Sequence, residues 1–128
     1  MEIKINTVTT DQDYRDCLYI RNKVFIEEQN INKKLEYDDK KVNAIYIVAK
    51  INLITIGTAR YRPTDFGMKL ERFAVLKEYR KFGVGSAMVL YILKKLEKQK
   101  SIYLNSQKDV VNFYKKLGFE IIGEAFYE

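Results

Sequence analysis

A chain of 128 residues with 47% hydrophobic and 31% charged residues can build one hydrophobic core, so we expect a single domain over residues 1–128. Its net charge of +6 favours anionic partners, and the dispersed basic residues favour a small anion over a nucleic-acid backbone. The lack of histidine removes the commonest general base and most zinc sites, and one cysteine excludes an intrachain disulfide. We expect a cytoplasmic protein without metal, membrane or nucleic-acid partners, because no apolar run is long enough to span a bilayer.

The first half of the chain predicts a strand, a helix and a hairpin. Apolar and polar residues alternate over residues 2–8, and Thr10 then offers an N-cap to a helix. Arg21 interrupts the apolar face of this helix, which carries Tyr14, Cys17, Leu18 and Phe25. We interpret Cys17 as a core residue. Residues 44–50 and 55–61 predict a buried strand and its hairpin partner.

The second half predicts a turn, a strand, a glycine loop, a helix, a strand, a short helix and a last extended segment. These elements are expected at residues 63–67, 68–76, 80–86, 86–98, 101–105, 110–117 and 119–126. The whole order is β-α-β-β-β-α-β-α-β. It predicts an α/β fold in which helices flank a single mixed, mostly antiparallel sheet.

The segment from Arg80 to Ser86 places Gly83 and Gly85 between a predicted strand and a predicted helix. Such a loop can turn several backbone amides toward one point, where the helix dipole favours an anion such as phosphate. The loop lacks the P-loop lysine and the third glycine of a dinucleotide fold. Taken alone, the pattern could equally mark a loop that needs two permissive backbone positions.

The longer string F-A-V-x-x-x-x-R-x-x-G-x-G at residues 73–85 resembles motif A of the GCN5-related N-acetyltransferases (GNAT). N-F-Y-K-K-L-G-F at residues 112–119 resembles their motif B. Within this family, residues 21–29, 36–38 and 123–128 look like the ElaA-like branch. The resemblance covers essentially the whole chain and implies the acyl-CoA N-acyltransferase fold.

The family transfers acetyl from acetyl-CoA directly to a primary amine, without an acyl-enzyme. By resemblance, loop amides would hold the CoA diphosphate, near the charge of Arg80 or Lys81. A strand segment would pair with the pantetheine arm and polarise the thioester carbonyl. Gln107 stands where many relatives carry Asn near the cofactor thiol. The implied amide and strand residues are Lys81, Phe82, Gly83, Val84, Gly85 and Ser86, and Phe73, Ala74 and Val75.

Tyr114 matches the motif B tyrosine that protonates the departing thiolate in much of the family, although its spacing also fits an apolar helix stripe. Glu71, Glu28 or a water chain could take the proton of the amine. Arg21, Glu28 and Arg72 are the candidates for binding the acceptor.

The loops at residues 27–41 and 62–67 should shape the acceptor pocket. The arginines near it favour an anionic amine such as an amino-sugar phosphate of the glucosamine 6-phosphate type. Amino acids, polyamines and protein amines remain open, as does a non-catalytic acyl-CoA sensor. ElaA-like chains usually continue with a further strand beyond the segment that ends here at Glu128. We therefore expect an exposed sheet edge and a homodimer.

Overall fold

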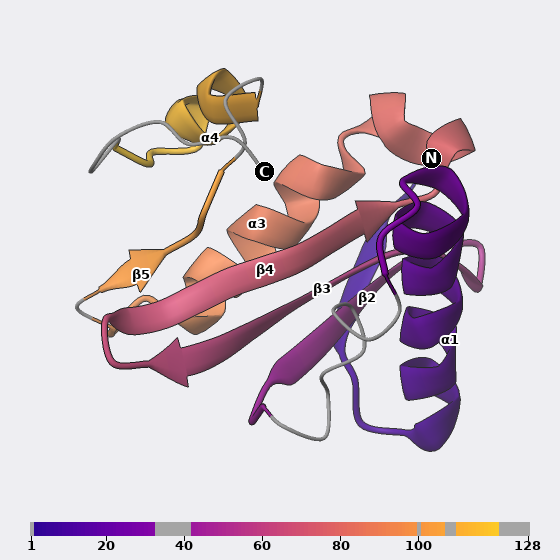
Figure 1. The fold of residues 1–128 in the computed structure, drawn as a ribbon, viewed down its shortest axis with the longest axis horizontal. Coiled ribbons are helices and arrows are strands. Elements are labelled where there is room, and N and C mark those ends of the chain that lie inside the picture. The colour runs from indigo at the N-terminus through magenta and orange to yellow at the C-terminus, as the bar shows by residue number, and fades with distance from the viewer. Residues whose placement is uncertain (1, 33–41, 100, 107–109, 121–128) are drawn as a thin grey trace.

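The computed structural model describes residues 2–32, 42–99, 101–106 and 110–120, which form one sheet with helices on both faces (Figure 1). In chain order the strands and helices are β1 (Lys4–Thr7), α1 (Asp11–Arg21), the π-helix η1 (Asn22–Glu28), β2 (Ile45–Ile51), β3 (Ile54–Thr64), β4 (Gly67–Val75), the 3₁₀ helix η3 (Lys77–Phe82), α3 (Val84–Lys95), β5 (Ile102–Tyr103) and α4 (Val111–Lys116).

The five strands follow the spatial order β1-β2-β3-β4-β5. The first four pair antiparallel, whereas β5 runs parallel to β4. The β4–β5 contact spans two residue pairs, Met68 with Ile102 and Lys69 with Tyr103. The chain after β5 turns away from β4 toward α4 (Figure 1). The predicted mixed, mostly antiparallel α/β sheet is therefore confirmed.

Local sequence explains most boundaries, although several differ from the prediction; α3, for example, spans Val84–Lys95 where residues 86–98 were predicted. Thr10 caps α1 as predicted, because its hydroxyl accepts from the amide of Asp13 at 3.1 Å. Where a surface loop was predicted from Glu27, the chain stays helical through Glu28 in η1. The predicted turn at residues 63–67 is shorter, since β3 continues to Thr64 and β4 starts at Gly67.

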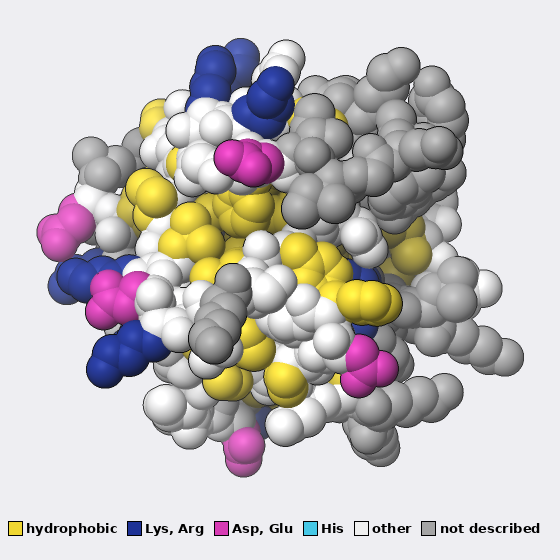
Figure 2. Space-filling model, turned by 90° about the vertical axis from the view of Figure 1, so that its left-hand side faces the viewer, with side chains coloured by type: hydrophobic (Ala, Val, Ile, Leu, Met, Phe, Trp, Pro, Cys, Tyr) yellow, Lys and Arg dark blue, Asp and Glu magenta, His cyan; other side chains and the backbone are white. Residues whose placement is uncertain are grey.

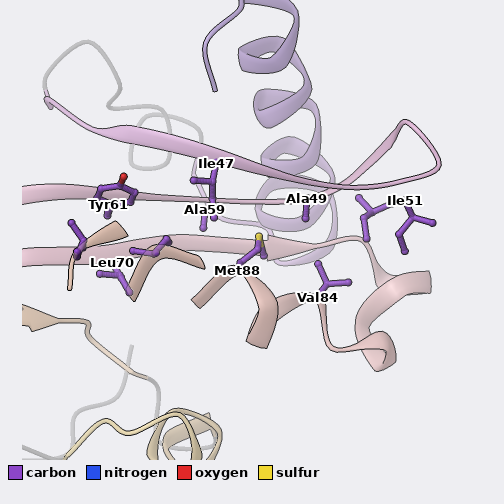
Figure 3. Close-up of a cluster of buried hydrophobic side chains, with 11 residues drawn as sticks. Ile47, Ala49, Ile51, Ala59, Tyr61, Leu70, Val84 and Met88 are labelled. Carbon is purple, nitrogen blue, oxygen red and sulfur yellow. The ribbon is translucent and has the colours of Figure 1, made fainter. Parts of the chain in front are cut away.

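The main core lies between the sheet and α3. Alternate residues of β2 and β3 face this helix, in keeping with the two-residue period of strands. Figure 3 shows this cluster, which includes Ile47, Ala49, Ile51, Ala59, Tyr61, Leu70, Val84 and Met88. Gly57 allows the close approach of α3, because a β-carbon there would lie 3.2 Å from Cγ1 of Val84.

A second, smaller core joins α1 and η1 to the opposite face of the sheet, through Ile20, Val24, Phe25 and Ala74. Cys17 is also fully buried here, as predicted, and burial raises the pKa of its thiol to about 11. The thiol is thus protonated and inert at neutral pH.

Residues 121–128, which carry most of the predicted last segment and the end on which the dimer prediction rests, lie outside the described residues. None of the helices described is long and apolar enough to traverse a lipid bilayer.

Candidate active site

The glycine loop joins η3 to the N-terminus of α3. Gly83 adopts φ 77° and ψ 18°, a left-handed conformation that favours glycine, and it ends η3 while capping α3. The carbonyl of Gly83 accepts the amide of Ala87 at 3.0 Å. The amides of Val84, Gly85 and Ser86 precede that first helical bond, so they belong to the helix end whose donors have no intrahelical acceptor. This geometry suits an anion, as the sequence predicted.

Strand β4 contains a bulge next to the predicted thioester segment. The register with β3 shifts by one residue between Thr58 and Arg60, so Arg72 and Phe73 together face the single residue Ala59. Arg72 takes φ 57°, a left-handed conformation that is uncommon for a side chain other than glycine. Bulges of this kind re-aim the strand at functional sites.

The outer edge of β4 beyond the bulge carries backbone groups that point away from β3. The amide of Leu76 donates to Ile56 at 2.9 Å, which makes Ala74, paired with Thr58, another hydrogen-bonded position. The carbonyl of Phe73 and the amide and carbonyl of Val75 therefore point to the outer edge. Because β5 pairs only with Met68 and Lys69 in the described chain, an extended ligand could bind this edge as an added strand.

A cavity of about 330 Å³ lies where β4 and β5 part. One wall is β4 from Lys69 to Phe73, which includes Glu71 and Arg72. The end of η1 and the segment after it form a second wall, through Phe25, Gln29 and Ile31. The chain after β5 and α4 close the third side with Leu104, Asn105, Ser106, Val110 and Tyr114. The structure thus brings together in one cavity Tyr114, Glu71, Arg72 and Phe73, which the sequence singled out separately.

Tyr114 is packed between aromatic rings, with the centroid of Phe113 at 5.0 Å and that of Phe119 at 5.9 Å, both edge to face. Burial raises the pKa of its phenol above the ordinary 10.0. The phenol is therefore fully protonated at neutral pH, the state that a proton donor requires.

Glu71 sits in a cluster of three cations on the α1 face of the sheet. Its Oε2 accepts from Nε of Arg60 at 2.7 Å and from Nε of Arg62 at 2.8 Å, and its Oε1 lies 3.3 Å from Nζ of Lys69. Burial alone would raise the pKa of Glu71, but hydrogen bonding from Arg62 and the charge of Arg60 outweigh it, so the pKa is lowered. A carboxylate held in this way is a weak proton acceptor, and its predicted role as base stays a prediction.

The cluster keeps a positive excess, because three cations surround one carboxylate. The side chain of Arg60 is 1% exposed, whereas those of Arg62 and Lys69 are 26% and 21% exposed. The last two charges can therefore meet an anion from solvent, and Lys69 also lines the cavity.

Two predicted site residues lie elsewhere. Arg21 is 1% exposed at the end of α1 and is absent from the cavity walls, and its charge offsets a part of the rise that burial causes in the pKa of the Cys17 thiol. Glu28 does not line the cavity either. Its carboxylate instead binds both terminal nitrogens of Arg80 at 2.6 Å each. Gln107 lies outside the described residues.

A larger cavity of about 710 Å³ adjoins the first and shares the side chain of Tyr114 and the chain after β5. Apolar side chains gather in the middle of the face that carries β5 and α4 (Figure 2). The cavity is lined mainly by such residues, among them Phe66, Leu93, Tyr103, Leu117 and Phe119. We place the chemistry in the smaller cavity, because β4 lines that one and contributes Lys69 and Glu71 of the charged cluster to its wall.

The comparisons with known proteins agree with this geometry. Residues 8–119 match the family model described as acetyltransferase (GNAT) family. The chain belongs to this family. YyaT of Bacillus subtilis is 35% identical over 132 residues, covering 98% of this chain and 88% of YyaT. YjcF of the same organism, named an uncharacterized N-acetyltransferase, is 35% identical over 120 residues, covering 89% of this chain and 83% of YjcF.

Escherichia coli ElaA has the same fold, with a TM-score of 0.85 at 22% identity, over 99% of this chain and 93% of ElaA. The predicted resemblance and fold are therefore confirmed, and this GNAT chain is an N-acetyltransferase. No group of three or more metal-binding side chains occurs in the ranges that the structure describes.

Sequence reasoning missed two features of this GNAT site. The first is the cation cluster on Glu71, since Arg60 and Lys69 come from different strands and meet through the β3–β4 register. An alternating charge pattern on the paired strands was the available signal. The second is that η1 stays helical through Glu28, within the segment 27–41 that was predicted to shape the pocket as a loop. Glu28 had been assigned to the acceptor, whereas the structure shows it bound to Arg80.

Proposed function

We propose that this protein transfers acetyl from acetyl-CoA directly to the primary amine of a small anionic acceptor, with an amino-sugar phosphate as the first candidate. The observation that carries the proposal is the composition of the smaller cavity. Its walls join a protonated tyrosine, an open strand edge, and Lys69 and Glu71 of the charged cluster.

The part of the proposal that concerns the cofactor rests on the glycine loop and on β4. The amides from Lys81 to Ser86 would bind the diphosphate at the N-terminus of α3, with the exposed Lys81 as the nearby charge. The pantetheine arm would pair with the outer edge of β4 at Phe73 and Val75, and an amide of this segment would polarise the thioester. AAC(6')-Iy, which has this fold (TM-score 0.78, 12% identity), was solved with a bisubstrate analogue that links CoA to acetylneamine.

The proposed transfer of acetyl needs one bond to form and one to break. The amine nitrogen attacks the thioester carbon, the C–S bond breaks, and the phenol of Tyr114 protonates the departing thiolate. The amine must also lose a proton. Because Glu71 is held by cations and Glu28 by Arg80, we propose that water carries this proton to solvent.

The part of the proposal that concerns the acceptor rests on the partly exposed charges of Arg62 and Lys69. An anionic group on the acceptor would lie against them, which orients the amine toward β4. The predicted contribution of Arg72, which lines the same cavity, belongs to this proposal, whereas that of Arg21, which lies outside the cavity walls, stays a prediction. The predicted homodimer and cytoplasmic location stay predictions.

The test is release of free CoA thiol from acetyl-CoA with pairs of amines that differ only in a phosphate, such as glucosamine 6-phosphate and glucosamine. We expect a higher kcat/KM for the phosphorylated member, and a roughly ten-fold smaller preference in Lys69→Gln. Lys94→Gln, the same charge change at an exposed position of α3, is the control and should keep the preference. Equal rates for both amines would remove the anionic acceptor, and CoA binding without thiol release from any amine would indicate a sensor.

A further inference from the structure

Arg80 and Glu28 form a two-pronged ion pair between segments 52 residues apart in the chain. Both terminal nitrogens of Arg80 donate to the carboxylate, Nη1 to Oε2 and Nη2 to Oε1, each at 2.6 Å. The third donor, Nε, binds the carbonyl of Val75 at 2.9 Å. All three nitrogens of the guanidinium are thus engaged by protein.

The pair connects the two halves of the site. Glu28 is the last residue of η1, and the chain directly after it supplies Gln29 and Ile31 to the wall of the smaller cavity. Arg80 lies in η3, at the start of the glycine loop and three residues before Gly83. In Figure 1 the helical turn before α3 lies beside the end of the helix that continues α1.

The contact with Val75 adds a third connection. The carbonyl of Val75 lies on the outer edge of β4, the edge that would receive the pantetheine arm. The side chain of Arg80 therefore links three parts of the site. They are the cavity wall at Gln29 and Ile31 (the acceptor wall), the outer edge of β4, and the glycine loop (the cofactor loop). The wall itself is closed by two backbone bonds, from Gln29 to Val24 at 3.1 Å and from Ile31 to Phe25 at 2.8 Å.

The exposure of the pair argues against a purely structural role. Each side chain is 37% exposed, so the pair covers little of the core and adds little to global stability. Its planar, bidentate geometry instead gives directional control over the two segments. Hydrogen bonding to Arg80 lowers the pKa of Glu28, so the carboxylate stays charged through neutral pH.

We propose that Glu28 and Arg80 form a latch that holds the acceptor wall against the cofactor loop, so that both are positioning residues. Arg80 then acts through the fold, and its side chain does not bind the diphosphate. The contact between the wall and the loop does not depend on the proposed function, whereas its effect on acceptor binding rests on that function.

The test compares Glu28→Gln, Arg80→Gln and the double variant with Glu27→Gln. Glu27 is a matched control, because it lies beside Glu28 in the same helix but pairs with Asn22 and Lys23 instead, at 2.7 and 3.4 Å. The measurements are amide hydrogen exchange at Gln29 and Ile31, the acceptor KM, and CoA affinity by calorimetry.

We expect Glu28→Gln to speed exchange at both amides and to raise the acceptor KM, each by about five-fold, with CoA affinity unchanged. The double variant should be no worse than Arg80→Gln alone, since the two residues act as one unit. Glu27→Gln should resemble the wild type in all three measurements.

Unchanged exchange in Glu28→Gln would overturn the latch. So would a ten-fold loss of CoA affinity in Arg80→Gln with Glu28→Gln unaffected, because Arg80 would then bind the cofactor. Faster exchange without acetylation of any anionic amine would support the latch and reject the proposed acceptor class, so the two proposals fail separately.

Discussion

Tyr114 is the residue whose surroundings most directly suit a chemical step. It lines both cavities and packs edge to face against two aromatic rings. Burial keeps the phenol neutral, while its position beside the outer edge of β4 leaves it accessible to a departing sulfur. The combination favours an acid over a purely structural tyrosine.

Replacing Tyr114 by Phe should lower kcat by roughly 100-fold, because the thiolate would leave without its proton donor. CoA affinity should change by less than about two-fold, since ring packing is kept. Steady-state kinetics and calorimetry check the two expectations. Tyr19→Phe, at a site 57% exposed on α1, is the control and should leave both unchanged.

The pH dependence follows from the raised pKa of this phenol. The proton donor is lost only as pH rises through that pKa, so the high-pH decline of kcat in the wild type should lie above pH 10.0. Tyr114→Phe should lack this decline. The same decline in both proteins would assign it to another group.

At the level of elements, the two glycines of the loop differ in backbone conformation and in the space around them. Gly83 has φ 77°, and a β-carbon placed there would meet no heavy atom within 4 Å, so only its backbone would resist a side chain. Gly85 is not in the left-handed region, and its β-carbon would meet Cζ of Phe113 at 3.5 Å. The backbone conformation therefore favours glycine at position 83, whereas at position 85 the contact is an ordinary one and neither backbone nor packing of the described residues requires glycine.

Gly83→Ala should cost about 1 kcal/mol of unfolding free energy, measured by urea titration, because alanine resists the left-handed conformation. Gly85→Ala should change stability by less than about 0.5 kcal/mol. It should nevertheless weaken CoA binding about ten-fold, because its methyl narrows the space between the loop and α4. If Gly85→Ala binds CoA as the wild type does, the diphosphate does not lie over this residue.

For the whole molecule, the parting of β4 and β5 leaves a gap that a long ligand could bridge. CoA would contact the loop, the edge of β4 and α4 at once, so binding should stabilise all three together. This expectation does not depend on which amine is the acceptor.

CoA at about 100 times its Kd should add about 2.7 kcal/mol of stability and raise Tm by roughly 10 °C. Pantetheine, which lacks the diphosphate, should raise Tm much less at the same concentration. Scanning calorimetry or thermal fluorescence measures both. Equal shifts for the two ligands would contradict the role of the glycine loop.

Short-range patterns in the sequence were enough to predict the strands, the N-cap at Thr10, the glycine loop and the burial of Cys17. Each depends on residues a few positions apart, for which periodicity, capping and glycine conformation are reliable guides. The motif around Tyr114 likewise predicted a residue that the structure places in the cavity.

Long-range geometry governed the rest. The bulge at Arg72, the cations around Glu71 and the bond between Glu28 and Arg80 all require partners distant in sequence. Such contacts follow from strand register and helix packing, and no local pattern encodes them. This is why Glu71 and Glu28, which the sequence suggested as base or acceptor residues, prove in the folded chain to be bound by arginines of other segments.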